Sequence, residues 1–242
     1  MSEKIRLDKF IASQIGVSRT DAKKIIRGGT VTVNGAAAKS ADMSVDTAHD
    51  TVACGGEPIG FKKHIYIMLN KPQGIVSASR SEGERTVVDL VPTELFRKGL
   101  FPAGRLDKDS TGFVLLTDDG AFAHSVLSPS RHVPKTYLVT ASDALSEDAM
   151  SGFRRGVPLS DGVTKPAEIG FVGFTDDSQP IYRVTLTEGR YHQIKRMFTF
   201  YGSTVTGLHR ISFGGLALDS ELLPGKCREL SPDEVKLIAK NQ

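Results

Sequence analysis

This 242-residue sequence has only two cysteines, no long apolar run and no strong excess of charge of either sign. The two cysteines, Cys54 and Cys227, lie far apart without a C-x-x-C spacing or a histidine cluster, which argues against a disulfide scaffold or a zinc site. The longest apolar run, residues 65–69, has five residues, whereas a membrane-spanning helix needs about 20. The sequence therefore predicts a protein that does not cross a membrane.

The global composition indicates a folded protein. Hydrophobic residues make up 39% and charged residues 24%, which is ordinary for a globular chain. The charged start continues into Leu7-Asp8-Lys9 instead of an apolar signal region, so we expect a cytoplasmic location. The formal net charge of +3 is too small to indicate a nucleic-acid partner by itself.

Charge is unevenly distributed along the chain. Between Lys4 and Lys39 there are eight basic residues and two acidic ones, whereas residues 40–57 hold four acidic residues and no Lys or Arg. A positive field therefore belongs to a small N-terminal unit, either as a phosphate-binding face or as a solvated helix face. The candidate RNA-binding residues there are Arg6, Lys9, Arg19, Lys23, Lys24 and Arg27.

Apolar spacing and turn residues predict the fold of this N-terminal unit. Leu7, Phe10 and their neighbours recur at helical spacing up to Gly16, and Ser18 is placed to cap a second helix. Val31 and Val33 alternate as a strand that leads into an Asn34-Gly35 hairpin turn. The turn-rich residues 55–60 predict a hinge, which divides the chain into domains 1–60 and 61–242.

The ordered segments of this unit resemble the S4 RNA-binding domain over roughly residues 4–55. The segments are Arg6-Leu7-Asp8-Lys9-Phe10, Ser18-Arg19, Lys23-Lys24-Ile25-Ile26-Arg27 and Val31-Thr32-Val33-Asn34-Gly35. The resemblance implies a helix-turn-helix with a small sheet. It favours phosphate binding over a solvated face.

The rest of the chain predicts a larger α+β domain with a mainly antiparallel or mixed sheet. Apolar alternation predicts strands at 65–69, 113–116, 137–139, 169–172 and 181–186. Helical patterns interrupt them near 121–127, 147–154 and 192–201. A second basic stretch lies between Arg183 and Arg210, where five basic residues accompany Glu188 alone.

The densest polar cluster is the loop at residues 104–112. Its residues Asp107, Asp109, Thr111, Gly112 and Asp118 fit an EF-hand-like register. A calcium loop needs a helix on each side, but glycine and proline interrupt the entering segment and residues 113–116 predict a strand. Asp107 is then either a catalytic carboxylate kept ionised beside Arg105 or half of an Arg-Asp pair that closes a turn.

Four ordered motifs resemble those of pseudouridine synthases, in the branch where an S4 domain precedes the catalytic domain. They are Gly104-Arg105-Leu106-Asp107 with Ser110-Thr111-Gly112, Leu69-Asn70-Lys71-Pro72-Gln73-Gly74, Lys135-Thr136-Tyr137, and residues 189–198 from Gly189-Arg190-Tyr191-His192 to Met197-Phe198. With the S4 segments, the resemblance covers essentially the whole chain. It implies a cofactor-independent isomerisation of uridine to pseudouridine in RNA.

The resemblance also implies roles for particular residues. Asp107 would be the essential carboxylate, Lys195 its cationic partner, and Tyr137 the aromatic residue that stacks on the uracil. The expected RNA contacts of this domain are Arg105, Arg190, His192, Arg196 and Arg210. The target base must be flipped out of its strand, and neither a metal nor a small-molecule cofactor is expected.

The third motif and residues 207–210 are closest to the branch that modifies small-subunit rRNA, where the resemblance implies uridine 516 of 16S rRNA. The expected partner is thus 16S rRNA or a small-subunit assembly intermediate. We expect the protein to act as a monomer and to have no membrane partner. Two alternatives remain open at this point. One is a large-subunit 23S rRNA pseudouridine synthase of the same branch, and the other is a non-catalytic RNA-binding ribosome-assembly factor.

Overall fold

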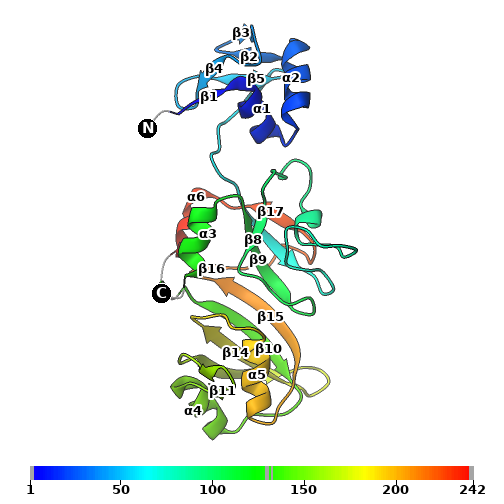
Figure 1. Cartoon of the computed structure of the whole chain (residues 1–242). Coiled ribbons are helices and arrows are strands. Elements are labelled where there is room, and N and C mark those ends of the chain that lie inside the picture. The colour runs from blue at the N-terminus through cyan, green and yellow to red at the C-terminus, as the bar shows by residue number, and fades with distance from the viewer. Residues whose placement is uncertain (1–2, 129–130, 132, 240–242) are drawn as a thin grey trace. The chain divides into compact units, whose positions relative to one another are not determined.

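The computed structural model describes residues 3–128, 131 and 133–239. The chain forms two compact units, whose elements are labelled in Figure 1. Unit 1 comprises the residues up to Ile65 together with Pro92–Leu100, and unit 2 comprises Tyr66–Val91 and the chain from Phe101 onward. The domain boundary between residues 60 and 61 stays a prediction. In the described ranges, every helix is too short or too polar to cross a membrane.

Unit 1 is a pair of helices packed with two small sheets. Its helices are α1 (Leu7–Ile15) and α2 (Arg19–Arg27). Strand β1 (Lys4–Arg6) pairs antiparallel with β4 (Ser44–Asp46). The second sheet has the order β3-β2-β5-β6, formed by β3 (Ala36–Ala37), β2 (Val31–Val33), β5 (Val52–Cys54) and β6 (Glu57–Ile59).

Local sequence signals fix the turns of unit 1 as predicted. Gly16 ends α1 in the left-handed region at φ 71°, and Ser18 Oγ caps α2 by accepting from the Asp21 amide at 3.1 Å. Asn34 and Gly35 both have positive φ, 53° and 80°, which is the geometry of a tight hairpin turn. The predicted helix-turn-helix with a small sheet is therefore confirmed.

The predicted hinge at residues 55–60 is wrong. Gly55 and Gly56, at φ 62° and 88°, form the turn between β5 and β6, which pair through Cys54 and Glu57. The signal for a turn was correct, but the flanking segments pair as a hairpin inside unit 1.

Unit 2 is built on one mixed sheet of nine strands within the described residues. Its main path has the order β13-β14-β10-β15-β9-β7-β17, with β16 paired to β15 and β8 paired to β9. The bounds are β7 (Tyr66–Lys71), β8 (Phe101–Ala103), β9 (Thr111–Thr117), β10 (Lys135–Ala141), β13 (Glu168–Phe174), β14 (Pro180–Leu186), β15 (Val205–Phe213), β16 (Leu216–Ala217) and β17 (Cys227–Glu229). The predicted α+β class and mixed sheet are confirmed.

One short parallel contact joins the two antiparallel halves of this sheet. Strand β15 pairs in parallel with β9, and the register places His209 beside Thr111 and Arg210 beside Gly112. Strand β15 has nine residues but was not predicted, because Gly207, His209 and Arg210 interrupt its apolar pattern. This contact lies where the polar loop at residues 104–110 enters β9.

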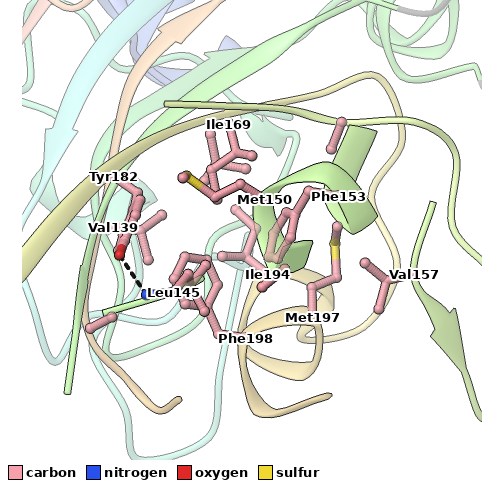
Figure 2. Close-up of a cluster of buried hydrophobic side chains, with 14 of the residues drawn as sticks. Val139, Leu145, Met150, Phe153, Val157, Ile169, Tyr182, Ile194, Met197 and Phe198 are labelled. Atoms are coloured by element: carbon pink, nitrogen blue, oxygen red, sulfur yellow. Dashed lines mark hydrogen bonds between the residues drawn. The ribbon is translucent and has the colours of Figure 1, made fainter. Parts of the chain in front are cut away.

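Helices α4 (Glu147–Arg155) and α5 (Gln193–Phe200) cover one face of the β13-β14-β10 half. In Figure 2, Phe153 of α4 and Phe198 of α5 meet in the buried cluster that these helices share with the strands. The hydroxyl oxygen of Tyr182 on β14 accepts a hydrogen bond from the Leu145 amide at 2.7 Å, which satisfies this polar group at the edge of the cluster. This packing fixes α5, which carries Lys195, against the sheet.

The other half of the sheet has its own apolar core. Helices α3 (Gly120–Leu127) and α6 (Pro232–Ala239) contact each other and pack on this core (Figure 1). The remaining short elements are a 3-10 turn at Val88–Leu90 and the hairpin of β11 (Pro158–Leu159) with β12 (Gly162–Val163). The predicted helices near 121–127, 147–154 and 192–201 are confirmed, whereas α6 was not predicted.

Candidate active site

Asp107 lies on the loop between β8 and β9 and faces two basic side chains of the α5 region. Its Oδ2 is 3.5 Å from Lys195 Nζ and 3.6 Å from His192 Nε2. The Asp107 side chain is one-third exposed, so water and a substrate can reach it. The predicted proximity of Lys195 to Asp107 is therefore present, and His192, expected to contact RNA, also faces this carboxylate.

Lys195 has a second acidic partner that the sequence did not single out. Its Nζ donates to both carboxylate oxygens of Asp109 at 2.7 Å. Burial disfavours the charged form of Lys195, but the hydrogen bond to Asp109 and the charges of Asp107 and Asp109 together raise its pKa. The same hydrogen bond lowers the pKa of Asp109. The site thus holds Lys195 as a cation between two carboxylates.

His192 reaches Asp107 because its backbone adopts a left-handed conformation just before α5. The φ and ψ angles are 48° and 34°, which cost a non-glycine residue about 1 kcal/mol. The imidazole stacks on the Tyr191 ring, with 3.8 Å between centroids. Such local strain is common at functional sites, where surrounding contacts hold the conformation.

These groups line an open pocket of about 430 Å³ in unit 2. Gln73 and Gly74, which follow β7, form one side of the pocket. The loop residues Asp107, Lys108 and Asp109 also line it, together with His192 and Lys195, which contact Asp107 directly. The pocket is large enough for a nucleobase with its sugar and is lined by charged groups of both signs.

Lys71 anchors the Asp107 loop through hydrogen bonds to its backbone carbonyls, a role that was not predicted. Its side chain is fully buried at the end of β7, and Nζ donates to the carbonyls of Pro72 at 3.1 Å, Lys108 at 3.2 Å and Ser110 at 2.7 Å. Burial lowers the pKa of Lys71 to about 8. The signal that could have identified it is a lysine at the end of a continuous apolar strand.

Arg210 anchors the same loop from β15, which corrects the prediction that it contacts RNA. The side chain is 1% exposed. Its Nε donates to the Phe113 carbonyl and its Nη2 to the Gly104 carbonyl, both at 2.6 Å. Because the side chain is almost fully buried, it does not face solvent, where an RNA phosphate would bind. Arg210 was misassigned because it was counted with exposed basic residues.

Arg190 and Arg196 are tied to the β11–β12 hairpin. Arg190 donates to the carbonyls of Gly162 at 3.0 Å and Val163 at 2.7 Å, while Arg196 pairs with Asp161. Both side chains are 26% exposed, so their contact with RNA stays a prediction. Arg105 is exposed on the Asp107 loop, and its RNA contact also stays a prediction.

Tyr137 lies half-buried on β10, directly across the β10–β15 ladder from Arg210. Its ring is 6.0 Å from the Arg210 guanidinium. Among the described residues, no hydrogen bond or ion pair joins Tyr137 to Asp107. Its predicted stacking on the uracil stays a prediction.

The basic residues of unit 1 have two kinds of environment. Arg6, Arg19 and Lys23 surround the buried Asp8, and Lys24 pairs with Asp21 at 3.1 Å. Lys9 and Arg27 are exposed. Across residues 3–128, 131 and 133–239, no three His, Cys, Asp or Glu side chains are arranged to hold a metal ion.

Comparison with known proteins gives these two units a family. Residues 65–200 match the RNA pseudouridylate synthase model, and residues 5–52 match the S4 domain. The chain belongs to the RNA pseudouridylate synthase family. It is accordingly an enzyme that isomerises uridine to pseudouridine in RNA, with an N-terminal S4 domain, as the resemblance implied.

Two curated relatives are similar along their full length. The chain is 42% identical to the "Uncharacterized RNA pseudouridine synthase YtzG" of Bacillus subtilis, over 98% of this chain and 100% of the relative. It is 43% identical to the "Ribosomal small subunit pseudouridine synthase A" of Escherichia coli K12, over 96% of this chain and 98% of the relative. A crystal structure of a pseudouridylate synthase is 38% identical with a TM-score of 0.65, covering 97% of this chain and 99% of the other.

Proposed function

We propose that this protein isomerises a uridine of small-subunit 16S rRNA, with Asp107 as the essential carboxylate. The observation that carries the choice of RNA is the 43% identity to the Escherichia coli ribosomal small subunit enzyme over 96% of the chain. The target nucleotide proposed from the sequence motifs is uridine 516. The pocket around Asp107 supports an enzymatic rather than a purely RNA-binding role.

The reaction breaks the bond between C1′ and N1, turns the uracil, and forms a bond between C1′ and C5. The C5 proton leaves and N1 gains a proton, so atoms and electrons balance without an oxidant, a reductant or a cofactor. Asp107 acts as an ionised group, either by adding to the sugar or the base or by removing the 2′ proton. Lys195 Nζ, 3.5 Å from Asp107 Oδ2, places a positive charge directly beside this carboxylate.

The proposed positions of the other groups follow from the pocket. Lys195 and His192 contact Asp107, and the pocket that all three line is open to receive a flipped nucleotide. Tyr137 is proposed to stack on the uracil and to assist proton transfer at C5. Arg105, Arg190 and Arg196 are proposed to contact the RNA around the target, and the basic face of the S4 domain to bind it elsewhere.

The first experiment tests the chemistry. Asp107→Asn removes the charge with little change in shape and is expected to abolish pseudouridine formation while RNA binding persists. Asp118→Asn is a matched control, because Asp118 lies beyond β9 and outside the pocket lining. Pseudouridine formed at the wild-type rate by Asp107→Asn would reject the catalytic role.

The second experiment tests the substrate. Deleting the gene in its host and mapping pseudouridines in both rRNAs should remove one site from 16S rRNA and restore it when the gene is returned. A site missing only from 23S rRNA would establish the large-subunit alternative. Unchanged rRNA in both subunits would favour an assembly factor without this activity.

We further propose that the enzyme works as a monomer in the cytoplasm, on 16S rRNA or on a small-subunit assembly intermediate. All side chains that line the pocket come from unit 2 of one chain, so a second copy is not needed to complete it. Light scattering in solution should give a mass near 26.1 kDa. A stable dimer would contradict the monomer.

A further inference from the structure

Asp8 is a fully buried carboxylate beneath the exposed basic side chains of the S4 domain's two helices. It lies in the first turn of α1 and is 0% exposed. Arg6 donates to it from Nε at 3.2 Å and from Nη2 at 3.1 Å, and Arg19 Nη2 donates to both oxygens at 2.9 Å. Lys23 Nζ is 3.9 Å away. A buried carboxylate therefore holds three basic side chains at one point.

The helix hairpin creates this convergence. Arg6 immediately precedes α1, Arg19 is the first residue of α2, and Lys23 follows Arg19 by four positions on the same helical face. The hydrogen bonds, led by that from Arg6, hold the pKa of Asp8 at about 2 although burial opposes this. The carboxylate is thus charged throughout the neutral range.

The three basic side chains keep donors for another ligand. Their exposed fractions are 50% for Arg6, 55% for Arg19 and 43% for Lys23. A guanidinium has three nitrogens with five N–H donors; Arg6 uses Nε and Nη2 for Asp8, and Arg19 uses Nη2 alone. Within the described part of the chain, the side chains of Arg6 and Arg19 make no other hydrogen bond. Nη1 of both arginines and Nε of Arg19 therefore have no hydrogen-bond partner within the described residues.

The charges are also out of balance. Three cations surround one anion, and the exposed Asp42 near Arg6 is the additional acidic group that acts on this cluster. One arginine would be enough to stabilise the buried charge of Asp8, because a single bidentate pair already satisfies a carboxylate. The cluster keeps a net positive charge even when Asp42 is counted, and a further anion would offset the repulsion among its cations.

We propose that Asp8 is a positioning residue that assembles Arg6, Arg19 and Lys23 into a binding site for a phosphate of the RNA backbone. The proposal rests on the proposed function, in which the S4 domain binds the rRNA substrate. Arginine pairs bind phosphate oxygens bidentately, and side chains already held in place lose less conformational entropy on binding. The phosphate chemistry fits the polyanion on which unit 2 acts.

Binding measurements separate this role from simple electrostatics, because the two make opposite predictions for Asp8→Asn. If Asp8 only repels phosphate, its neutralisation strengthens RNA binding. If Asp8 positions the cations, the variant binds roughly 5- to 10-fold more weakly near 0.1 M salt, with a smaller salt dependence. The probes are labelled transcripts of 16S and 23S rRNA fragments, bound by the full-length protein.

Asp21→Asn is the matched control. Asp21 is an exposed carboxylate of α2 that pairs with Lys24, another candidate RNA contact. Its neutralisation should leave the affinity unchanged or raise it by up to about 3-fold. Equal or tighter binding by folded Asp8→Asn, as in this control, would overturn the proposal.

A double-mutant cycle with Arg19→Gln tests whether Asp8 acts through its partners. The proposal expects Asp8→Asn to weaken binding much less in the Arg19→Gln background than in the wild type. Full additivity would overturn it. If circular dichroism shows that Asp8→Asn does not fold, Arg6→Gln and Arg19→Gln take its place, and wild-type affinity in both would overturn the proposal.

The outcome is separable from that of the proposed function. Weakened binding of whichever rRNA the wild type binds supports the Asp8 site even if pseudouridine mapping selects the large subunit. Conversely, loss of a 16S site on gene deletion upholds the proposed function even if Asp8→Asn binds RNA normally. Wild-type protein that binds neither transcript would reject the phosphate site.

Discussion

Lys195 lies closer to Asp109 than to Asp107. Its Nζ is 2.7 Å from both oxygens of Asp109 and 3.5 Å from Oδ2 of Asp107. The two carboxylates are two positions apart on one loop, so they compete for the same ammonium group. Asp109 thereby holds Lys195 beside Asp107, with which the ammonium group makes the longer of its two ion pairs.

Asp109→Asn should therefore change the site without removing the reacting carboxylate. The pKa of Lys195 should fall, because the hydrogen bond and charge of Asp109 contribute to raising it. We expect the single-turnover rate to fall about 10-fold, since displaced catalytic groups are costly, while RNA affinity stays within about 2-fold. NMR titration of the lysine and rapid-quench assays measure both effects, and an unchanged rate would contradict a positioning role for Asp109.

Arg210→Met should destabilise the protein rather than weaken RNA binding. The change leaves the carbonyls of Phe113 and Gly104 without their donor, at a cost of about 2–5 kcal/mol in the free energy of unfolding. Arg105→Met, an exposed arginine on the same loop, should change stability by less than about 0.5 kcal/mol. Urea unfolding and RNA titration compare the two variants. Weaker RNA binding by a fully stable Arg210→Met would restore the original RNA-contact prediction.

The lowered pKa of Lys71 predicts how the free energy of unfolding depends on pH. Its folded pKa of about 8 lies below the ordinary lysine value of about 10.4, so between these values the unfolded chain binds more protons. The contribution of Lys71 to the free energy of unfolding must therefore rise with pH in that window. Below pH 8 both states carry the proton and the contribution is constant.

Comparison with Lys71→Met isolates this contribution, because the similarly shifted Lys135 remains in both proteins. Between pH 7.5 and 9.5, the stability of the wild type should increase relative to that of the variant by about 1–2 kcal/mol. Urea unfolding at both pH values gives the difference. A constant difference would show that Lys71 does not titrate in this range.

Gly112→Ala should be severely destabilising. Gly112 has φ 98°, and a Cβ there would lie 2.8 Å from the Arg210 nitrogen and closer still to its carbonyl oxygen. We expect a loss of about 3 kcal/mol or more and loss of activity, because the strain falls on the strand contact beside the Asp107 loop. Gly120→Ala is the control, since this position opens α3 and has no atom within 4 Å of the added Cβ. Thermal melts should show no destabilisation of the control.

Elements governed by neighbouring residues could be predicted from the sequence. Ser18 capped its helix and Asn34-Gly35 formed its turn, because both depend on conformations within four residues. The same local logic failed at Gly55-Gly56, where the turn was recognised but its partners were not. Whether two flanking segments pair is decided by the core beneath them, as Val52 and Ile59 show by pairing in unit 1.

The candidate site was recognised by motif, but its internal arrangement depended on contacts between distant segments. Asp107 and Lys195 were expected to pair and do so at 3.5 Å, but the shorter contacts of Lys195 with Asp109 were not predicted. Arg210 was counted as exposed charge because composition cannot distinguish a solvated arginine from a buried one. Lys71 gave only the weak signal of a charge that ends an apolar strand.

The two-residue parallel contact between β15 and β9 has a consequence for biosynthesis. Thr111 and Gly112 cannot form this pairing until His209 and Arg210, almost a hundred positions later in the chain, have been synthesised. Contacts so distant along the chain form late, and nascent chains fold from the N-terminus as they emerge. The catalytic loop can therefore be completed only after residue 210 has been synthesised, when the S4 domain has long been free to fold.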